Sequence, residues 1–287
     1  MPSPLVSVVI PTYNRKDFLI EAVESVLNQS YRNIELIVAD DGSTDGTYEE
    51  LENRGLLGSL RYVRIDHCGR PGRVRNAGIR KSSGKYIALL DSDDTWLPKK
   101  LEMQVELMEG MAFHTVPPLC HTRERWIRNG REVSQAGQKH RREGYIFEDA
   151  LKKCIIGPST VLFKRELLDD VGYFDEELEI AEDYELWLRV TARYPVAYIN
   201  LPLVIKRGGH EDQLSEKYGQ IEVFRIRALL KVLHSREAAS WSDKQRSLAF
   251  GELARKCRIY ANGCYKRGKI GEGDEYMRLS LRYRNGG

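Results

Sequence analysis

Long apolar runs are missing from this sequence. None approaches the roughly 20 residues that a helix needs to cross a bilayer. The first residues, MPSPLVSVVIP, lack the basic start and the small-residue cleavage site of a signal peptide. These two absences predict a protein that stays in the cytoplasm.

Cysteine is scarce and scattered. The five cysteines are Cys68, Cys120, Cys154, Cys257 and Cys264, and no two of them form a CxxC pair. We therefore expect free thiols rather than disulfides or a zinc site. Histidines and Cys120 do gather in the segment 110–144, but their spacing matches no common zinc site. This segment has few periodic apolar residues, and we predict that it is an insertion or flap that faces the substrate.

Two phosphate-binding signatures are also absent. No GxGxxG follows the first apolar stretch, and no GxxxxGK[ST] occurs anywhere in the chain. The first absence disfavours a dinucleotide-binding fold, and the second disfavours a P-loop enzyme.

The composition is that of an ordinary globular protein, with 41% hydrophobic and 30% charged residues in 287. Its net charge of +3 is unevenly spread, because residues 217–287 hold 16 Lys and Arg against 7 Asp and Glu. Such a basic region could approach anionic lipid or an acidic partner, or it could form the solvated faces of amphipathic helices.

The first hundred residues alternate between two patterns. Short apolar runs typical of strands cover 5–11, 34–39, 60–65 and 85–90, and helical periodicity covers 17–28, 47–53 and 73–81. This alternation predicts an α/β fold with a mostly parallel sheet flanked by helices. Further strands are expected at 155–163 and 196–203, and further helices at 164–171, 182–194, 221–233, 248–260 and 273–281. The last three predict a helical appendage at the C-terminus.

Four polar residues, Asp91-Ser92-Asp93-Asp94, end the strand at 85–90. Three carboxylates so close together repel one another unless they are solvated, hydrogen-bonded or neutralised by a cation. Magnesium-type ions take such oxygen ligands, usually together with substrate phosphates. The other interpretation is a helix cap at Asp94 or Thr95 before a helix near Pro98, and we expect Asp94 to have that role.

Eight blocks of the sequence together resemble the family 2 glycosyltransferases of GT-A fold. They are VSVVIPTYNR (6–15), SVLNQSY (25–31), ELIVADDGSTDGT (35–47), RNAGI (75–79), GKYIALLDSDDTWLPKKL (84–101), VGYFDE (171–176), EDYELWLR (182–189) and GGHEDQLS (208–215). The resemblance implies a GT-A domain at 1–215, with the insertion at 110–144 outside the shared pattern. The helical region at 216–287 is not covered.

The resemblance also implies an activity. Such enzymes move a sugar from a nucleotide-diphosphate sugar to an acceptor hydroxyl, with inversion at the anomeric carbon and with Mn²⁺ or Mg²⁺ as cofactor. The donor is expected to be a UDP-sugar, and the acceptor a saccharide, a lipid-linked molecule or a protein. Nucleic acid is not expected as a partner, and peripheral membrane contact through the basic C-terminal helices is left open.

Individual residues match the motifs of that family. Pro11, Thr12, Tyr13 and Asp41 would hold the base and ribose, Arg75 would contact the nucleotide, and Asp91-Ser92-Asp93 matches the DxD motif. Asp93 is then the better metal ligand and Asp91 lies nearer the ribose. His210 matches a histidine that completes the metal or diphosphate site, and Asp183 matches the catalytic base.

Chemistry supports this assignment of two separate carboxylate groups. A clustered pair can hold a metal ion that takes up charge on the leaving diphosphate. A distant carboxylate can accept the proton of the acceptor hydroxyl on the opposite face of the sugar. Adjacent residues near a helix start point in different directions, so either Asp183 or Glu182 faces the site, and we favour Asp183.

Two other functions fit parts of the sequence. A nucleotidyltransferase also uses carboxylates and a metal, but a Gly-rich phosphate loop is expected where this chain has TYNRKD. A catalytically silent scaffold that binds sugar nucleotides is disfavoured by the intact Asp91, Asp93, Asp183 and His210. In the segment 110–144, Trp126 packs in the core or stacks on an acceptor sugar.

Overall fold

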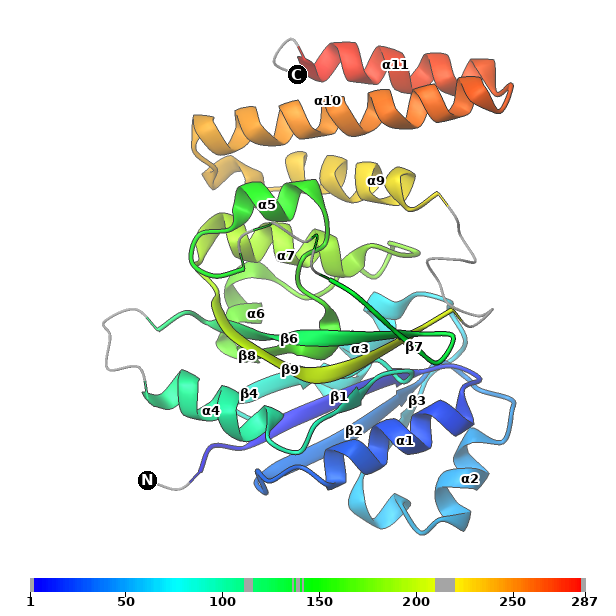
Figure 1. The fold of residues 1–287 in the computed structure, drawn as a ribbon, viewed down its shortest axis with the longest axis vertical. Helices are drawn as coiled ribbons and strands as arrows, with labels where there is room; N and C mark the ends of the chain where they lie inside the picture. The colour runs from blue at the N-terminus through cyan, green and yellow to red at the C-terminus, as the bar shows by residue number, and fades with distance from the viewer. Residues whose placement is uncertain are drawn as a thin grey trace.

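A twisted nine-stranded sheet forms the centre of the protein (Figure 1). The structure is a computed structural model, and it describes residues 3–110, 116–135, 137, 140, 142–209 and 220–284. The strand order is β3-β2-β1-β4-β8-β6-β9-β5, with β7 paired to β6. The strands are β1 (Val6–Thr12), β2 (Ile34–Asp40), β3 (Arg61–Arg64), β4 (Tyr86–Leu89), β5 (Thr95–Trp96), β6 (Leu119–Arg128), β7 (Arg131–Val133), β8 (Val161–Lys164) and β9 (Ala197–Gly208).

The first four strands are parallel, as predicted. In the register, Val6 of β1 lies opposite Ile34 of β2 and Tyr86 of β4. Their carboxyl ends therefore meet at one edge of the sheet. Strand β8 runs antiparallel to β4, and β6 is antiparallel to β8 but parallel to β9. The mixed, mostly parallel α/β sheet expected from the sequence is confirmed.

Both faces of the sheet are covered by helices. Val8 and Ile10 of β1 pack with Leu19 of helix α1 on one face, while Val9 packs with Ile79 of helix α3 on the other. Because successive side chains of a strand point to opposite faces, a strand covered on both faces is apolar throughout. The helices that cover the sheet or connect its strands are α1 (Lys16–Leu27), α2 (Thr47–Asn53), α3 (Pro71–Arg80), α4 (Lys100–Gly110), α5 (Phe147–Lys152), α6 (Glu166–Val171) and α7 (Glu182–Arg193).

Three C-terminal helices stack on the outer side of α5 and α7 (Figure 1). They are α9 (Ile221–Leu233), α10 (Asp243–Lys266) and α11 (Ile270–Arg284). Leu229 and Leu253 from these helices share one buried apolar cluster with Leu151 of α5 and Leu188 of α7. The predicted appendage is therefore attached to the sheet domain through a common core. The boundary expected at residues 215 and 216 lies outside the described residues.

Part of the segment 110–144 differs from the prediction. Residues Leu119–Arg128 are the strand β6, which lies inside the sheet between β8 and β9. Leu119, Cys120 and His121 are buried there. The segment 110–144 is therefore not an insertion throughout, because Leu119–Arg128 within it form a strand of the sheet.

The expected strand at 155–163 is shorter in the structure. A 3₁₀ turn at Pro158–Thr160 precedes β8, whose first residue is Val161.

Among the helices of the described part of the chain, none has the length and apolar character that a membrane span requires.

Candidate active site

The first side chains of the site follow β1. Pro11 and Thr12 are the last residues of that strand, and Thr12 is 4% exposed. Its hydroxyl oxygen is buried, and within the described residues it has no hydrogen-bond partner. Tyr13 lies just beyond the strand and is 40% exposed. Its ring stacks on the imidazole of His67, with centroids 4.1 Å apart. An aromatic surface therefore lies at the end of β1.

Asp41, at the end of β2, orders the neighbouring loop. Its carboxylate accepts hydrogen bonds from the amides of Cys68 and Gly69, both at 2.9 Å, and Oδ2 lies 2.9 Å from Nδ1 of His67. Asp41 is only 3% exposed. The sequence predicted that Asp41 binds the nucleotide. In the structure Asp41 contacts His67, and the ring of His67 stacks on Tyr13. No role was predicted for His67. The Gly-rich basic loop that contains it, between a strand and a helix, could have indicated a functional residue there.

The end of β4 carries the three aspartates. The carboxylate of Asp91 accepts a hydrogen bond from Nη2 of Arg75 at 2.7 Å, and its amide donates to Oγ of Ser159 at 3.0 Å. Ser92 is buried, with 3% of its surface exposed. Asp93 lies 2.9 Å from Nη1 of Arg15, which comes from the loop after β1. Both carboxylates of the predicted DxD motif therefore contact a guanidinium.

Asp94 does not cap a helix, so that prediction was wrong. It is 1% exposed and accepts hydrogen bonds from the hydroxyl of Ser159 at 2.6 Å and from the amide of Arg207 at 3.0 Å. Burial raises its pKa well above the usual value, while Lys206 opposes the rise. Helix α4 begins later, at Lys100. Asp94 instead ties the DxD turn to β9, which the sequence could not show because β9 lies more than a hundred residues away.

Arg75 joins two motifs that are distant in the sequence. It lies on α3, is 5% exposed, and pairs with Asp91 on one side and with Glu182 on the other. Its guanidinium also lies 5.6 Å from the ring centroid of Phe174. This buried side chain brings the start of α7 to the end of β4. The sequence had predicted only a contact with the nucleotide.

The two acidic residues at the start of α7 have different surroundings. Glu182 is 4% exposed and is held by Arg75. Burial raises the pKa of its carboxyl to about 7, although the Arg75 guanidinium opposes the rise. Asp183 is only half-buried, and the thiol of Cys154 lies 3.3 Å from its Oδ2. Of the two carboxylates, that of Asp183 is the more exposed to solvent.

The donor set suits a divalent ion that arrives with a diphosphate. Asp91 and Asp93 supply hard carboxylate oxygens and are partly exposed, at 22% and 13% of their side chains. Among the described residues, no three His, Cys, Asp or Glu side chains group closely enough to hold an ion by themselves. Mg²⁺ is typically bound by one or two carboxylates plus substrate phosphates, so these residues fit the group. His210, predicted as a further ligand, lies outside the described residues.

An open groove of about 620 Å³ lies along β6, β7 and β9. Trp126, Arg142 and Tyr198 contribute to its lining. The indole nitrogen of Trp126 donates to Glu124 at 2.6 Å, and the ammonium of Lys206 lies 5.4 Å from its ring centroid. Lys206 is adjacent to Arg207, whose amide binds Asp94. The groove is thus connected to the DxD turn through β9.

Comparison with known protein families gives a match over most of the sheet domain. The family model for Glycosyl transferase family 2 matches residues 7–172. An uncharacterized glycosyltransferase of Rickettsia bellii is 36% identical over 188 residues, which are 66% of this chain and 26% of that protein. The chain thus spans about a quarter of the length of that relative.

A second relative is covered more fully. The Escherichia coli protein WfaP, described as a UDP-Glc:alpha-D-GlcNAc-diphosphoundecaprenol beta-1,3-glucosyltransferase, is 32% identical over 191 residues. The match covers 66% of this chain and 71% of WfaP.

Solved structures resemble the fold over nearly the whole chain. TarS residues 1–349 of S. aureus, crystallised with UDP-GlcNAc, superposes with a TM-score of 0.66 at 19% identity. The superposition covers 98% of this chain and 92% of the TarS chain. The mannosyltransferase PcManGT of Pyrobaculum calidifontis, in complex with GDP-Man and Mn²⁺, gives a TM-score of 0.59 at 17% identity and covers 97% and 86%. These likenesses confirm the predicted GT-A fold.

Proposed function

The chain belongs to Glycosyl transferase family 2, and we propose that it moves a sugar from a nucleotide-diphosphate sugar to an acceptor hydroxyl with inversion at the anomeric carbon. The observation that carries the proposal is the double ion pair of Arg75 with Asp91 and Glu182. This contact supports the proposal because it holds the turn at Asp91 beside the acidic start of α7. Ligand sites of open α/β sheets lie at this carboxyl edge of the strands.

The proposed donor is a UDP-sugar. Support comes from WfaP, whose name specifies UDP-Glc, and from the TarS complex with UDP-GlcNAc. We propose that Pro11, Thr12 and Tyr13 hold the base and ribose together with Asp41. The exposed ring of Tyr13 suits stacking on a base, and the unpartnered hydroxyl of Thr12 can bind a polar group of the nucleotide. Asp91, Ser92 and Arg75 complete the nucleotide side of the site.

We propose that Mn²⁺ or Mg²⁺ binds with the donor, through Asp93 and His210. The PcManGT complex with Mn²⁺ supports a divalent ion in this fold. When bound, the ion supplies positive charge that stabilises the departing diphosphate. Asp93 is paired with Arg15, so we expect this ion pair to open when donor and metal enter. We propose that the guanidinium of Arg15 then donates hydrogen bonds to a phosphate oxygen of the donor.

Asp183 is the proposed general base. Its carboxylate accepts the proton of the acceptor hydroxyl while that oxygen forms a bond to the anomeric carbon. The bond between that carbon and the diphosphate oxygen breaks, and the nucleoside diphosphate leaves with the electron pair. The thiol of Cys154 positions Asp183. Glu182 keeps Arg75 in place and is too buried to meet the acceptor.

The acceptor is the least defined part of the proposal. WfaP is named for a lipid-linked acceptor, and we propose a saccharide that is free, lipid-linked or attached to a protein. The groove beside Trp126 is a suitable place for it, because aromatic rings stack well on sugars. The cytoplasmic location and the peripheral membrane contact of the basic helices stay predictions.

A donor-hydrolysis and transfer assay tests this function. Purified protein with Mn²⁺ and a panel of nucleotide sugars and acceptors is expected to release a nucleoside diphosphate. Asp183→Asn should lower kcat by at least about a hundredfold, since a general base contributes on that order. Asp169→Asn, at an exposed position of α6, is the control and should keep full activity.

Three results would contradict the proposal or part of it. Release of a sugar 1-phosphate instead of a nucleoside diphosphate would indicate transfer of the nucleotidyl group, which is the reaction of a nucleotidyltransferase. Binding of sugar nucleotides without turnover on any acceptor would indicate a scaffold. If Asp183→Asn stayed active while Glu182→Gln lost activity but remained folded, Glu182 would be the base.

A further inference from the structure

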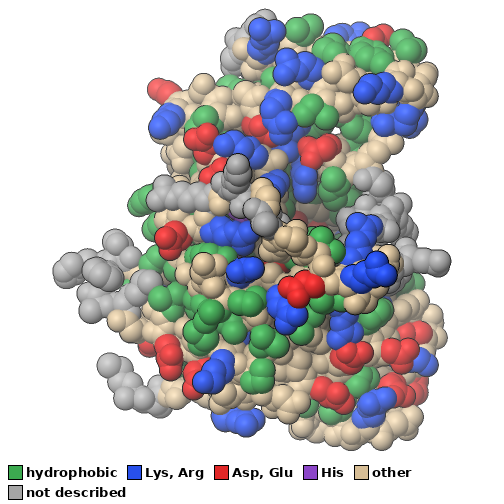
Figure 2. All heavy atoms as spheres, in the orientation of Figure 1, with side chains coloured by type: hydrophobic (Ala, Val, Ile, Leu, Met, Phe, Trp, Pro, Cys, Tyr) green, Lys and Arg blue, Asp and Glu red, His purple; other side chains and the backbone are tan. Residues whose placement is uncertain are grey.

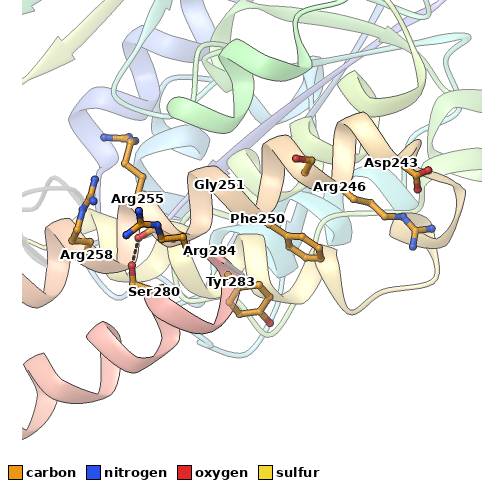
Figure 3. A pocket seen from close by; sticks show the side chains of 11 residues that line it. Asp243, Arg246, Phe250, Gly251, Arg255, Arg258, Ser280, Tyr283 and Arg284 are labelled. Atoms are coloured by element: carbon orange, nitrogen blue, oxygen red, sulfur yellow. Dashed lines mark hydrogen bonds between the residues drawn. The ribbon is translucent and has the colours of Figure 1, made fainter. Parts of the chain in front are cut away.

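A second groove, of about 540 Å³, lies between α10 and α11, far along the chain from the proposed active site. We call it the arginine groove, because its lining includes Arg246, Arg255, Arg258 and Arg284. Phe250 and Tyr283 form its apolar part, with ring centroids 5.5 Å apart. Figure 3 shows Arg255, Arg258 and Arg284 gathered at one end of the groove, with the rings of Phe250 and Tyr283 nearer its middle. The groove is therefore amphipathic along its length.

The packing of the two helices explains why a groove is present. Near the connecting turn, Gly273 of α11 lies against the ring of Tyr265, where even a single added carbon would collide. Farther along α10, Gly251 has nothing within 4 Å of the position of a β-carbon. The helices touch closely at one end, and small residues leave space at the other. The hydroxyl of Ser280 holds the two helices together by donating to the carbonyl of Ala254 at 2.7 Å.

The charge of the groove is incompletely neutralised. Arg255 is paired with Glu252 through two hydrogen bonds, of 2.8 and 2.7 Å, and Arg246 donates to backbone carbonyls. Arg258 and Arg284 are exposed, and neither forms an ion pair with any described residue. Asp243 is the acidic residue of the lining and lies at the opposite end from these two (Figure 3).

Helix-end electrostatics account for only part of this pattern. Cations are favourable in the last turn of a helix, which explains Arg284 at the end of α11. Arg255 and Arg258 lie inside α10, away from its C-terminus at Lys266. Their position on the same face, three residues apart, therefore needs another reason.

Exposed aliphatic residues accompany the arginines. Ile259, Ile270 and Leu281 are 46%, 56% and 53% exposed, and all three lie on α10 or α11. They lie on the same two helices as the arginines but outside the lining of the groove. Figure 2 shows many Lys and Arg side chains over these helices at the top of the molecule. Exposed aliphatic and cationic side chains on one pair of helices are typical of segments that lie on a membrane surface.

We propose that the arginine groove binds the phosphate headgroup of an anionic membrane lipid, with Arg258 and Arg284 as the main phosphate contacts. A guanidinium donates two parallel hydrogen bonds to a phosphate, and the half-buried ring of Phe250 offers an apolar surface to the glycerol and upper acyl region. The groove would hold this end of the molecule on the membrane. The inference does not depend on the residues proposed for sugar transfer.

Vesicle co-sedimentation of the full chain tests the proposal. The protein should bind vesicles of phosphatidylcholine with phosphatidylglycerol and not vesicles of phosphatidylcholine alone. Arg258→Glu with Arg284→Glu should weaken partitioning by more than about tenfold, because each basic residue near an anionic surface contributes substantially. Both positions are exposed, so the thermal unfolding temperature should fall by no more than a few degrees, the loss expected from reversing the charge of Arg284 in the last turn of α11.

A matched control separates the groove from overall charge. Lys266→Glu with Arg278→Glu changes the net charge equally at exposed positions of the same two helices, outside the groove. This variant should lose less than about threefold in partitioning. Equal losses in the two variants, or no binding to anionic vesicles, would overturn the proposal. Protection by inorganic phosphate in a thermal-shift assay without vesicle binding would overturn it in favour of a soluble anion.

Discussion

At the scale of single residues, the site depends most on Arg75. Its guanidinium is almost fully buried and neutralises carboxylates from two separate motifs. Removing one partner of a buried ion pair leaves an uncompensated charge, which is far more costly than the net gain of the pair. Arg75 is therefore both part of the proposed nucleotide site and a structural contact between α3, β4 and α7.

Arg75→Met is predicted to lower the free energy of unfolding by about 3–5 kcal/mol, because Glu182 and Asp91 would lose their shared cation. Urea denaturation measures this loss. Arg80→Met on the same helix removes a pair with Glu176 that is about half exposed, and should cost less than about 1 kcal/mol. Equal losses for the two variants would contradict the importance assigned to burial.

Cys154 is the second residue whose role came from the structure. Its thiol lies 3.3 Å from Asp183 and 3.4 Å from the carbonyl oxygen of Ile156. Cys154→Ser keeps a hydroxyl donor for Asp183, whereas Cys154→Ala removes the donor. We expect Cys154→Ala to lower kcat while KM changes little, and to shift the pH profile of kcat. Cys154→Ser should keep the wild-type pH profile. A profile that is identical in all three proteins would show that the thiol does not act on Asp183.

Lys100 makes stability depend on pH. Its ammonium group is fully buried and lies 3.9 Å from the ring centroid of Trp96, and burial lowers the pKa of Lys100 to about 7. In the unfolded chain the pKa is near 10.5, so unfolding takes up a proton between about pH 7 and 10.5. Stability from this group therefore rises with pH across that window, by at most about 1.4 kcal/mol per pH unit.

Lys100→Met should remove this rise. Urea denaturation between pH 6 and about 9 measures it, as the difference in slope between the two proteins. Lys99→Met, at the neighbouring exposed position, should keep the wild-type slope. Parallel curves for wild type and Lys100→Met would mean that Lys100 titrates normally in the folded state.

At the scale of elements, α3 approaches the sheet closely because Gly78 has no side chain. A β-carbon there would lie 2.5 Å from Cγ1 of Val9 in β1 and 3.3 Å from Cβ of Ala39 in β2. This close approach brings α3, and Arg75 with it, to the strand ends. The glycine is thus needed for packing, although it weakens the helix by itself.

Gly78→Ala is predicted to lower the free energy of unfolding by about 1–3 kcal/mol, because overpacking outweighs the gain in helix propensity. Gly251→Ala in α10 has open space around the new methyl group and should raise stability by up to about 1 kcal/mol. Thermal and urea denaturation of both variants test the opposite signs. A stabilised Gly78→Ala would show that the sheet can move away from α3 at little cost.

At the scale of the whole molecule, the C-terminal helices share a core with the sheet domain. Leu229 of α9 is fully buried in the cluster that also includes Tyr184 and Leu188 of α7. Because α7 carries Glu182 and Asp183, this cluster also supports one side of the proposed active site. The helices are therefore part of the folding unit, whatever additional surface they provide.

Leu229→Ala is predicted to lower stability by about 2–5 kcal/mol and to leave a single unfolding transition. Differential scanning calorimetry measures both properties. Leu281→Ala on α11, where the side chain is 53% exposed, should change stability by less than about 0.5 kcal/mol. Two separate transitions would show that the helical region unfolds independently.

Local patterns in the sequence determined most of the helices and strands. They also determined after which strands the polar motifs lie. The alternation of apolar strands and amphipathic helices predicted the parallel half of the sheet, because both patterns depend on neighbouring residues. The resemblance of the motif blocks then implied the GT-A fold and the family, and both are confirmed. Strand β6 was missed because LCHTRERWIR is buried at its start and exposed later, so it shows neither alternation nor an apolar run.

Only the tertiary structure decided which charged groups meet. Arg75 pairs with Glu182 across more than a hundred residues, Asp94 is buried under β9 rather than at a helix end, and Cys154 reaches Asp183. These contacts set the burial and the pKa of each group, since both depend on what surrounds a side chain in space. Sequence periodicity reports on neighbours within a few residues, so such long-range pairs were beyond it. The amino-acid pattern alone therefore determined most of the elements and the family, whereas the partners and the burial of the individual carboxylates were decided by the folded chain.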